Sequence, residues 1–300
     1  MKKFKFLALG LSIITLSFLL TSDTWAEKVI QLSPTISEII ELEAEDYAEG
    51  NFNVINNGDE EFTFSLRSAP YSVVGEDYDD DFQTNTNYNK IASWIKTSSD
   101  KYTLKPGELA NVTYSITTPD DIPNGGQYAA ILITLEENHN SGNIQVNKQL
   151  AYKVYTHMNG VTRKEGEIKE NKISSFLLGA KITASSLFTN TGNVDAEADI
   201  TFEVIDIKND EVVYSNTLNT KRTILPETTR FVNYTWENTP QLGIFKVRQT
   251  IKYLDKESVT EKIVFVCPFW LLILVALFII VAIIWLINNN KNRKTAKGNY

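Results

Sequence analysis

Cysteine and histidine are nearly missing from this chain of 300 residues, which contains only Cys267, His139 and His157. A single cysteine cannot form a disulfide within the chain, although secreted animal sandwiches usually carry disulfides. No nucleophile elbow and no metal-ligand spacing is present either. Carboxylates are too plentiful to mark a hydrolytic pair. The composition therefore predicts a protein that has no disulfide, is not an enzyme and needs no cofactor.

Basic charge is scarce outside the two ends of the chain. The chain has 29 Lys and Arg against 37 Asp and Glu, a net charge of −8. Because both ends are basic, the region between them is more acidic than the whole. Binding of polyanions requires a basic face. We therefore expect no nucleic-acid partner.

Long uncharged runs occur only near the two ends, and residues 265–287 form the longer one. A helix rises about 1.5 Å per residue, so this run covers a hydrocarbon core of about 30 Å. The basic residues that follow should stay on the cytoplasmic side. We predict a transmembrane helix over residues 264–287 and a cytoplasmic basic tail over residues 288–300. The membrane is thus an expected partner, and the plasma membrane, with the preceding region outside, is the expected location.

The N-terminus has the pattern of a secretory signal peptide. Lysines at positions 2, 3 and 5 precede the apolar residues 6–20, and a polar segment closes at Ala26. This pattern predicts cleavage after Ala26 and a signal peptide over residues 1–26. A retained helix would leave the topology unchanged, because the middle of the chain would still be exported.

Alternating apolar and polar residues indicate strands throughout the middle of the chain. Phe52 and Val54 alternate with polar residues, as do Phe62 and Leu66, and residues 56–59 between them are turn formers. This pattern predicts a hairpin. Residues 128–135 are apolar on both faces, which is typical of a central strand covered on both sides.

The same features recur in the same order roughly 120 to 135 residues later, which predicts two copies of one plan. The pairs are Asn56-Asn57-Gly58 with Asn190-Thr191-Gly192, Leu104-Lys105-Pro106-Gly107 with Ile224-Leu225-Pro226-Glu227, and Val112-Tyr114-Ile116 with Val232-Tyr234-Trp236 in alternation.

Short strands at turn-rich spacing predict an all-β fold of two tandem immunoglobulin-like β-sandwiches plus one C-terminal transmembrane α-helix. We place the first sandwich at residues 27–155, with an inserted loop at about 74–99. A connector over residues 156–165 leads to the second sandwich at residues 166–262. Trp236 alternates with Val232 and Tyr234 and is expected in the core.

Five short segments of the first predicted sandwich form a set, namely Ser33-Pro34, Asn53-Val54-Ile55-Asn56-Asn57-Gly58, Ser93-Trp94-Ile95, Tyr102-Thr103-Leu104-Lys105-Pro106-Gly107-Glu108 and Gly125-Gly126-Gln127-Tyr128. This set resembles the WxL-interacting family of bacterial surface proteins. The resemblance implies a signal peptide, two immunoglobulin-like domains, one transmembrane helix and a peptidoglycan-binding first domain. The second domain resembles the family less, and no ligand-contacting residue is transferred.

Acidic residues are concentrated in the predicted insertion, where Asp77, Asp79 and Asp81 lie close together. Oxygen ligands in a loop are what Ca²⁺ prefers. The spacing is not that of an EF-hand, because Phe82 stands where the glycine should be. These three residues are therefore a candidate Ca²⁺ site, and the alternative is a solvated acidic loop.

Aromatic residues alternate with amides and carboxylates in and beside the same insertion. Tyr71, Tyr78 and Tyr88 are candidate ligand-binding residues, because rings flanked by polar groups suit sugars. The alternative is that these tyrosines cover the edge of the sandwich while Trp94 belongs to the core.

The segment Leu225-Pro226-Glu227-Thr228 matches a sortase motif, but Thr229 replaces the required glycine and the apolar run begins far downstream. Its place in the repeat favours a structural turn. Taken together, the sequence predicts a membrane-anchored surface binding or adhesion protein whose first sandwich contacts cell-wall peptidoglycan or partner surface proteins. The alternative is a membrane-tethered chaperone or scaffold for the assembly of other surface proteins.

Overall fold

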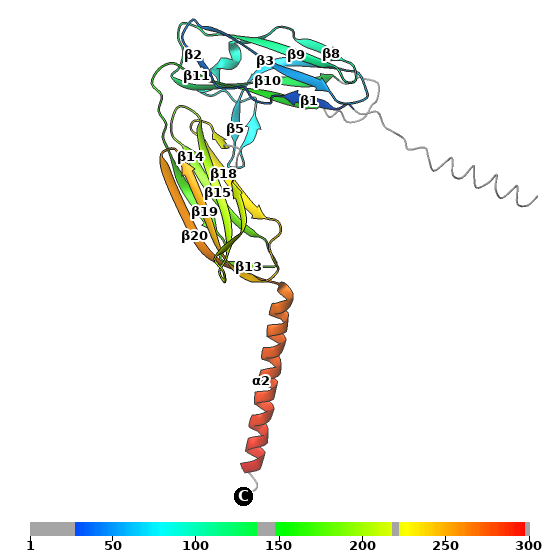
Figure 1. Ribbon diagram of the computed structural model, residues 1–300, viewed down its shortest axis with the longest axis vertical. Helices are drawn as coiled ribbons and strands as arrows, with labels where there is room; N and C mark the ends of the chain where they lie inside the picture. Colours follow the sequence, from blue (N-terminus) through cyan, green and yellow to red (C-terminus); the bar gives the residue numbers. More distant parts are fainter. Residues whose placement is uncertain (1–27, 137–147, 218–221, 298–300) are drawn as a thin grey trace, which may run out of the picture.

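The computed structural model describes residues 28–136, 148–217 and 222–297, so the predicted signal peptide and His139 lie outside the described residues. Strands account for nearly all regular structure before a single C-terminal helix (Figure 1). Two β-sandwiches follow one another along the chain, each around its own core. The predicted all-β fold of two immunoglobulin-like sandwiches and a C-terminal helix is confirmed.

The first sandwich packs a four-stranded sheet, ordered β1-β3-β9-β7, against a five-stranded sheet, ordered β2-β11-β10-β4-β8. A small hairpin, β5 with β6, and a short 3-10 helix, η1, are added to it. The elements are β1 (Ile30–Ser33), β2 (Ile40–Leu42), β3 (Tyr47–Asn56), β4 (Phe62–Pro70), β5 (Ser72–Val74), β6 (Asp79–Asp81), η1 (Lys90–Ser93), β7 (Ile95–Thr97), β8 (Lys101–Leu104), β9 (Leu109–Thr117), β10 (Gly125–Glu136) and β11 (Gln149–Met158).

The second sandwich packs a sheet ordered β12-β14-β18 against one ordered β13-β20-β19-β15-β16, in which β17 also pairs with β15. Trp236 lies in its core, as predicted. The elements are β12 (Gly166–Ile173), β13 (Phe176–Leu178), β14 (Ile182–Asn190), β15 (Ala196–Asp206), β16 (Glu211–Thr217), β17 (Arg222–Ile224), β18 (Thr229–Trp236), β19 (Gly243–Tyr253), β20 (Lys256–Cys267) and the helix α2 (Phe269–Lys297).

The turn that follows β3 carries the chain from one sheet to the other. The side-chain amide of Asn56 donates hydrogen bonds to the carbonyls of Glu60 (2.8 Å) and Leu104 (3.0 Å), and the Gly58 N–H donates to its Oδ1 (3.0 Å). The predicted hairpin is therefore wrong, since β3 and β4 belong to opposite sheets. Alternation shows which side chains are buried but not which strands pair.

The second sandwich repeats this turn atom for atom. The amide of Asn190 donates to the carbonyls of Val194 (2.8 Å) and Ile224 (2.8 Å), and the Gly192 N–H donates to its Oδ1 (2.9 Å). Each asparagine is fully buried. The predicted repeat is confirmed at this turn, where one amide joins three segments of each sandwich.

Strand β10 is central to the first sandwich, as its continuous apolar sequence predicts. It pairs with β11 on one side and β4 on the other. One face, which includes Ile131 and Ile133, packs into the sandwich core. The other face, which includes Tyr128 and Leu132, belongs to a third hydrophobic cluster outside the sandwich.

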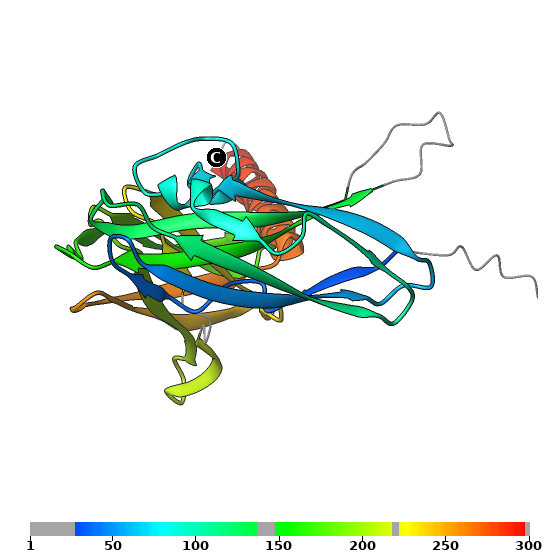
Figure 2. The same ribbon diagram turned by 90° about the horizontal axis from the view of Figure 1, so that it is seen from above.

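The predicted insertion over residues 74–99 is only partly a loop. Its last residues form β7, which pairs with β9 through Ile95 and Ile116. Ile91 and Ile95 are buried in the core of the first sandwich, which explains why this end of the segment joins the sheet. The β5–β6 hairpin instead extends from the first sandwich toward the second (Figure 1). Seen from above, the first sandwich lies across the second (Figure 2).

The C-terminal helix begins five residues later than predicted. Residues 264–267 are the end of β20, where Val264, Val266 and Cys267 are buried in the second sandwich, so Cys267 is not in the helix and the sandwich extends beyond residue 262. Composition could not separate this strand from the helix, because both are apolar. Within α2, Phe269–Ile287 has the length and hydropathy to cross a membrane.

Candidate functional site

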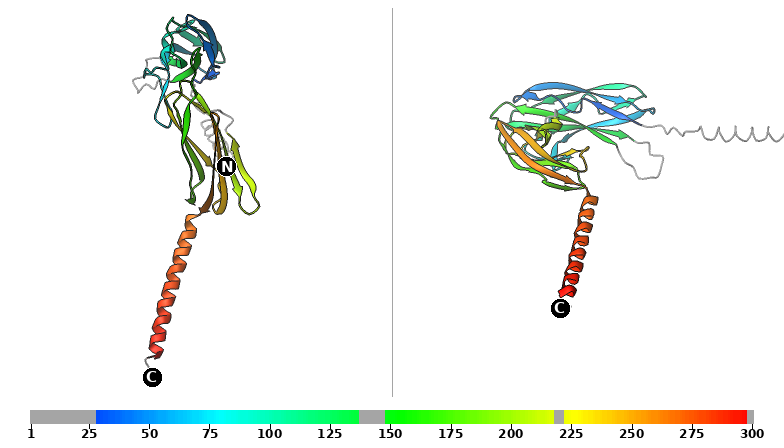
Figure 3. Two further views of the ribbon diagram at one scale, coloured as in Figure 1. Left: turned by 90° about the vertical axis from the view of Figure 1, so that its left-hand side faces the viewer. Right: turned by 60° about the horizontal axis from the view of Figure 1, so that its bottom comes forward.

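A hydrophobic cluster fills the space between the two sandwiches, which meet at a marked angle (Figure 3). It combines Tyr71, Tyr128 and Tyr155 of the first sandwich with Leu225 of the second. Leu225 belongs to the turn that matches a sortase motif, and its side chain is fully buried. The structure therefore confirms this segment as a structural turn, one that packs against the first sandwich.

Tyr78, in the turn of the β5–β6 hairpin, connects the two sandwiches directly. Its hydroxyl accepts a hydrogen bond from the Leu225 N–H and lies 3.2 Å from the Thr228 hydroxyl. The guanidinium of Arg230 lies 4.2 Å from the centre of its ring, a cation–π distance. Burial raises the pKa of Tyr78 to about 12, so the hydroxyl stays protonated at neutral pH.

A polar cluster on another side of the interface surrounds Asp195, which immediately precedes β15. The hydroxyl of the buried Tyr128 donates a hydrogen bond to the Asp195 carboxylate (2.8 Å). The backbone N–H of Asp195 in turn donates to the Tyr128 hydroxyl oxygen (2.7 Å). Nε2 of His157 lies 2.7 Å from the same carboxylate oxygen. Asp195 is therefore held by two residues of the first sandwich.

The connector is also bonded to the second sandwich. Its predicted span of 156–165 is shorter in the structure, because β11 continues to Met158 and includes His157. The Asn193 amide donates to the Val161 carbonyl (2.8 Å), and its Oδ1 accepts from the Arg163 N–H (2.6 Å). Together with the Asp195 cluster, these bonds fix the angle between the sandwiches.

Gly125 allows the two backbones to approach closely at this junction. Its φ is +95°, and a Cβ at this position would lie 2.2 Å from the Asn193 carbonyl oxygen. The neighbouring Gly126 N–H donates to that oxygen (2.7 Å). A side chain at position 125 would therefore separate the sandwiches.

The stability of the interface is expected to fall as the pH rises through the pKa of His157 in the folded protein. The hydrogen bond with Asp195, assisted by the charges of Asp195 and Glu41, raises the pKa of His157 above its usual 6.5, while burial and Lys164 oppose this shift. A histidine whose pKa is raised in the folded state stabilises the fold fully when the pH is below the pKa of the unfolded chain. This stabilisation is lost as the pH rises through the pKa of the folded state.

Thermal unfolding between about pH 6 and about pH 8 tests this expectation. The melting temperature of the wild-type chain should decline over this range more than that of His157→Gln, which cannot become charged. Equal slopes for the two chains would contradict the role of His157.

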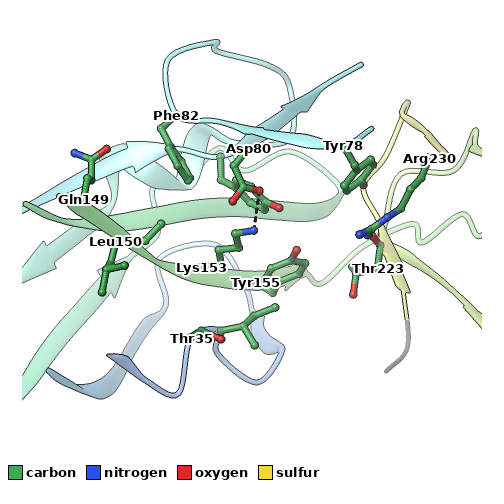
Figure 4. A pocket seen from close by; sticks show the side chains of 13 residues that line it. Thr35, Tyr78, Asp80, Phe82, Gln149, Leu150, Lys153, Tyr155, Thr223 and Arg230 are labelled. Carbon is green, nitrogen blue, oxygen red and sulfur yellow. Dashed lines mark hydrogen bonds and ion pairs between the residues drawn. The ribbon is translucent and has the colours of Figure 1, made fainter. Parts of the chain in front are cut away.

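A cleft of about 730 Å³ opens where the first sandwich, the β5–β6 hairpin and the second sandwich meet (Figure 4). Tyr71, Tyr78 and Phe82 line it from the hairpin region. Strand β11 lines the opposite side with Lys153, whose ammonium pairs with Asp80 (2.7 Å) and lies 4.7 Å from the centre of the Tyr71 ring. The cleft thus combines aromatic walls with charges.

The edge of β11 is open inside this cleft. Strand β2 and the preceding segment cover the edge only from Lys153 onward, where the Lys153 N–H donates to the Thr35 carbonyl (3.1 Å). In an antiparallel ladder, alternate residues direct their backbone groups to the same side. Ala151 and Gln149 therefore direct theirs to the open edge, where no partner is found among the described residues.

The candidate tyrosines occupy different positions around this cleft. Tyr71 and Tyr78 line it, but Tyr71 is only 2% exposed, so it has little ring surface left for a sugar. Tyr88 lies outside the cleft and packs edge-on against Tyr128 at 6.1 Å between ring centres. All three side chains pack at the hydrophobic cluster between the sandwiches, and their contact with a sugar stays a prediction.

The acidic candidates do not converge. Asp79 and Asp81 lie on β6, and Asp77 lies in the preceding turn. The carboxylate of Asp81 instead accepts hydrogen bonds from the N–H groups of Gln83 (2.9 Å) and Thr84 (3.3 Å). Among the described residues, no three His, Cys, Asp or Glu side chains are grouped to hold a metal ion.

Comparison with known proteins gives structural likenesses at low sequence identity. No family model and no curated protein matches the chain. The class 5 fimbriae chaperone CfaA superimposes with a TM-score of 0.38 at 12% identity, covering 78% of this chain and 99% of that chain. The E. coli chaperone DraB superimposes with a TM-score of 0.39 at 10% identity, covering 79% and 97%.

The CsuC-CsuE chaperone–tip adhesion subunit pre-assembly complex of Acinetobacter baumannii superimposes to a similar degree. Its TM-score is 0.38 at 11% identity, covering 78% of this chain and 98% of that chain. TM-scores and identities this low do not support a shared function, so the proposed function rests on the geometry of this chain.

Proposed function

We propose that the chain is a membrane-anchored bacterial surface protein that holds an extended segment of a partner surface protein along the open edge of β11. In this role it would serve as a scaffold or chaperone for surface assembly rather than as an enzyme. The open backbone groups of Ala151 and Gln149 in the cleft are the observation that carries the proposal.

Strand addition suits this edge for physical reasons. An added strand would obtain backbone hydrogen bonds from β11, and its side chains would contact the cleft walls. Ala151 is small and half-buried, so it leaves room for side chains beside Phe82. Lys153 and Arg230 at the same cleft are each held over an aromatic ring. Because their charges are thus fixed in position, they would select among partner segments by charge.

The rest of the fold supports presentation of this edge at a fixed position. The helix α2 would anchor the second sandwich in the plasma membrane, and the bonded interface would hold the first sandwich at a set angle above it. A scaffold benefits from such fixed geometry, because a bound segment then stays oriented relative to the membrane.

Site-specific photocrosslinking tests the proposal. The photoreactive residue is placed at Gln149, which is exposed on the open edge, in the full chain in its source membrane. We expect a discrete adduct with a surface protein. The matched control is Thr113, an exposed residue on β9 of the opposite sheet, which should yield none.

Two outcomes would argue against the scaffold. Equal adducts from both positions would indicate unspecific contact. An absence of protein adducts together with retention of the full chain on purified peptidoglycan would instead favour the glycan-binding function expected from the family resemblance.

A further inference from the structure

The end of the second sandwich nearest the helix carries exposed apolar side chains on the outer face of its larger sheet. Phe176, Phe265 and Ile244 are neighbours across β13, β20 and β19, and the rings of Phe176 and Phe265 stack at 5.8 Å. Phe176, Ile244 and Ile263 are each more than half exposed. No described residue covers this row.

The same face becomes charged farther from the helix. Arg248 lies on this face of β19, between Glu203 and Glu261, with nitrogen–oxygen distances of 3.4 Å and 2.5 Å. Between the apolar row and this charged zone around Arg248, Lys246 pairs with Asp210 (2.9 Å). Polarity therefore changes along the strands, from apolar beside the helix to ionic away from it.

A pocket of about 500 Å³ lies at the junction with the helix. The walls come from the end of the sandwich, including Pro240 and Val266, and from the first turns of α2, including Trp270 and Ile273. The ion pair of Lys181 with Glu237 also lines this pocket. Helix residues that would lie at the outer edge of the hydrocarbon are thus next to the end of the sandwich.

The distances suit contact with lipid. Phe265 precedes Phe269 by four residues, or about 13 Å of strand. The headgroup layer is roughly 5 to 8 Å thick on each side of the core. An upright sandwich would hold the apolar row just above this layer, and a tilt of about 20°, which is ordinary for a membrane helix, would lower it.

We infer that the second sandwich leans onto the bilayer, with the face formed by Phe176, Ile244 and Phe265 in the outer headgroup layer. The occupant of this face is phospholipid, because β20, which carries Phe265, leads directly into the apolar helix and the polarity changes in the direction of the membrane normal. The inference rests on the proposed membrane anchoring. It adds that the lipid surface fixes the tilt of the exported region.

Fluorescence quenching by lipids tests the contact. The full chain carries Cys267→Ala, which removes the one free, buried thiol, and a single new cysteine bears an environment-sensitive dye. The labelled chain is placed in phosphatidylcholine nanodiscs at one copy per disc, with or without spin labels on the lipid headgroups. We expect a dye at Ile244→Cys to lose most of its emission when the spin label is present.

The matched control is Val259→Cys, which is on the same face of the same sheet and is equally exposed (52% against 51%) but lies beyond the charged zone. Its emission should stay unchanged. A dye at Phe278→Cys, on the exposed surface of α2, should be quenched by lipids labelled deep in the acyl chain.

These arms separate the possible failures. An unquenched Phe278 dye would refute membrane anchoring itself. A quenched Phe278 dye with an unquenched Ile244 dye would overturn the lipid contact alone. A change at Ile244 that appears only with two copies per disc would assign the face to a second copy, and would overturn the proposal as well.

Discussion

Replacing Asp195 by alanine is expected to lower the free energy of unfolding by about 3 kcal/mol, because removal of one partner from a buried pair leaves the others unsatisfied. The hydroxyl of Tyr128 would lose its acceptor in a fully buried site, and His157 would lose its carboxylate. The first sandwich would then be held by the apolar cluster, the connector and the contacts of the β5–β6 hairpin, including those of Tyr78. We expect a broader distribution of inter-sandwich distances, measured between spin labels, and a lower melting temperature.

The matched control is Asp199→Ala, four residues farther along the chain on β15, where the carboxylate is exposed. This variant should behave like the wild-type chain. Asp195→Asn keeps an acceptor but loses the charge, so it should fall between the two. If Asp195→Ala and Asp199→Ala gave the same distances and melting temperatures, the Asp195 cluster would not hold the sandwiches together.

The features that could be predicted from the sequence are those that act locally. Alternation identified the strands, and the continuous apolar run identified β10 as central. The turn at Asn56 and its repeat at Asn190 were also readable, because each needs an asparagine followed two residues later by glycine. The residues that make up each of these patterns lie within a few positions of one another in the sequence.

The cleft and the interface could not be predicted, because their parts are far apart in the chain. Asp195 is one of 37 acidic residues, and it differs from the others only by its partners Tyr128 and His157, 67 and 38 residues away. The open edge of β11 depends on how far β2 extends beside it, which alternation does not show. One signal was available: the second apolar face of β10 required a cover beyond its own sandwich.

Replacing Ala151 by proline is expected to weaken capture of the partner segment about tenfold or more, since loss of one buried backbone hydrogen bond costs about 1.4 kcal/mol or more. Proline has no N–H to offer an added strand, and its ring would obstruct the strand's approach. The fold should survive, because prolines are tolerated on edge strands and the Ala151 N–H has no partner among the described residues. The measurement is the affinity of the full chain for the surface protein that crosslinks at Gln149.

Ala151→Val is the matched control, because it adds a side chain of similar bulk but keeps the N–H, and it should bind within a few-fold of the wild-type chain. A second variant, Phe82→Asp, leaves the edge intact and places a charge on the aromatic wall of the cleft, so it should weaken binding without changing the backbone of β11. Loss with proline and aspartate but not valine would place the partner strand in the cleft. Unchanged affinity of a folded Ala151→Pro chain would instead mean that the partner binds elsewhere, because strand addition at this edge requires that N–H.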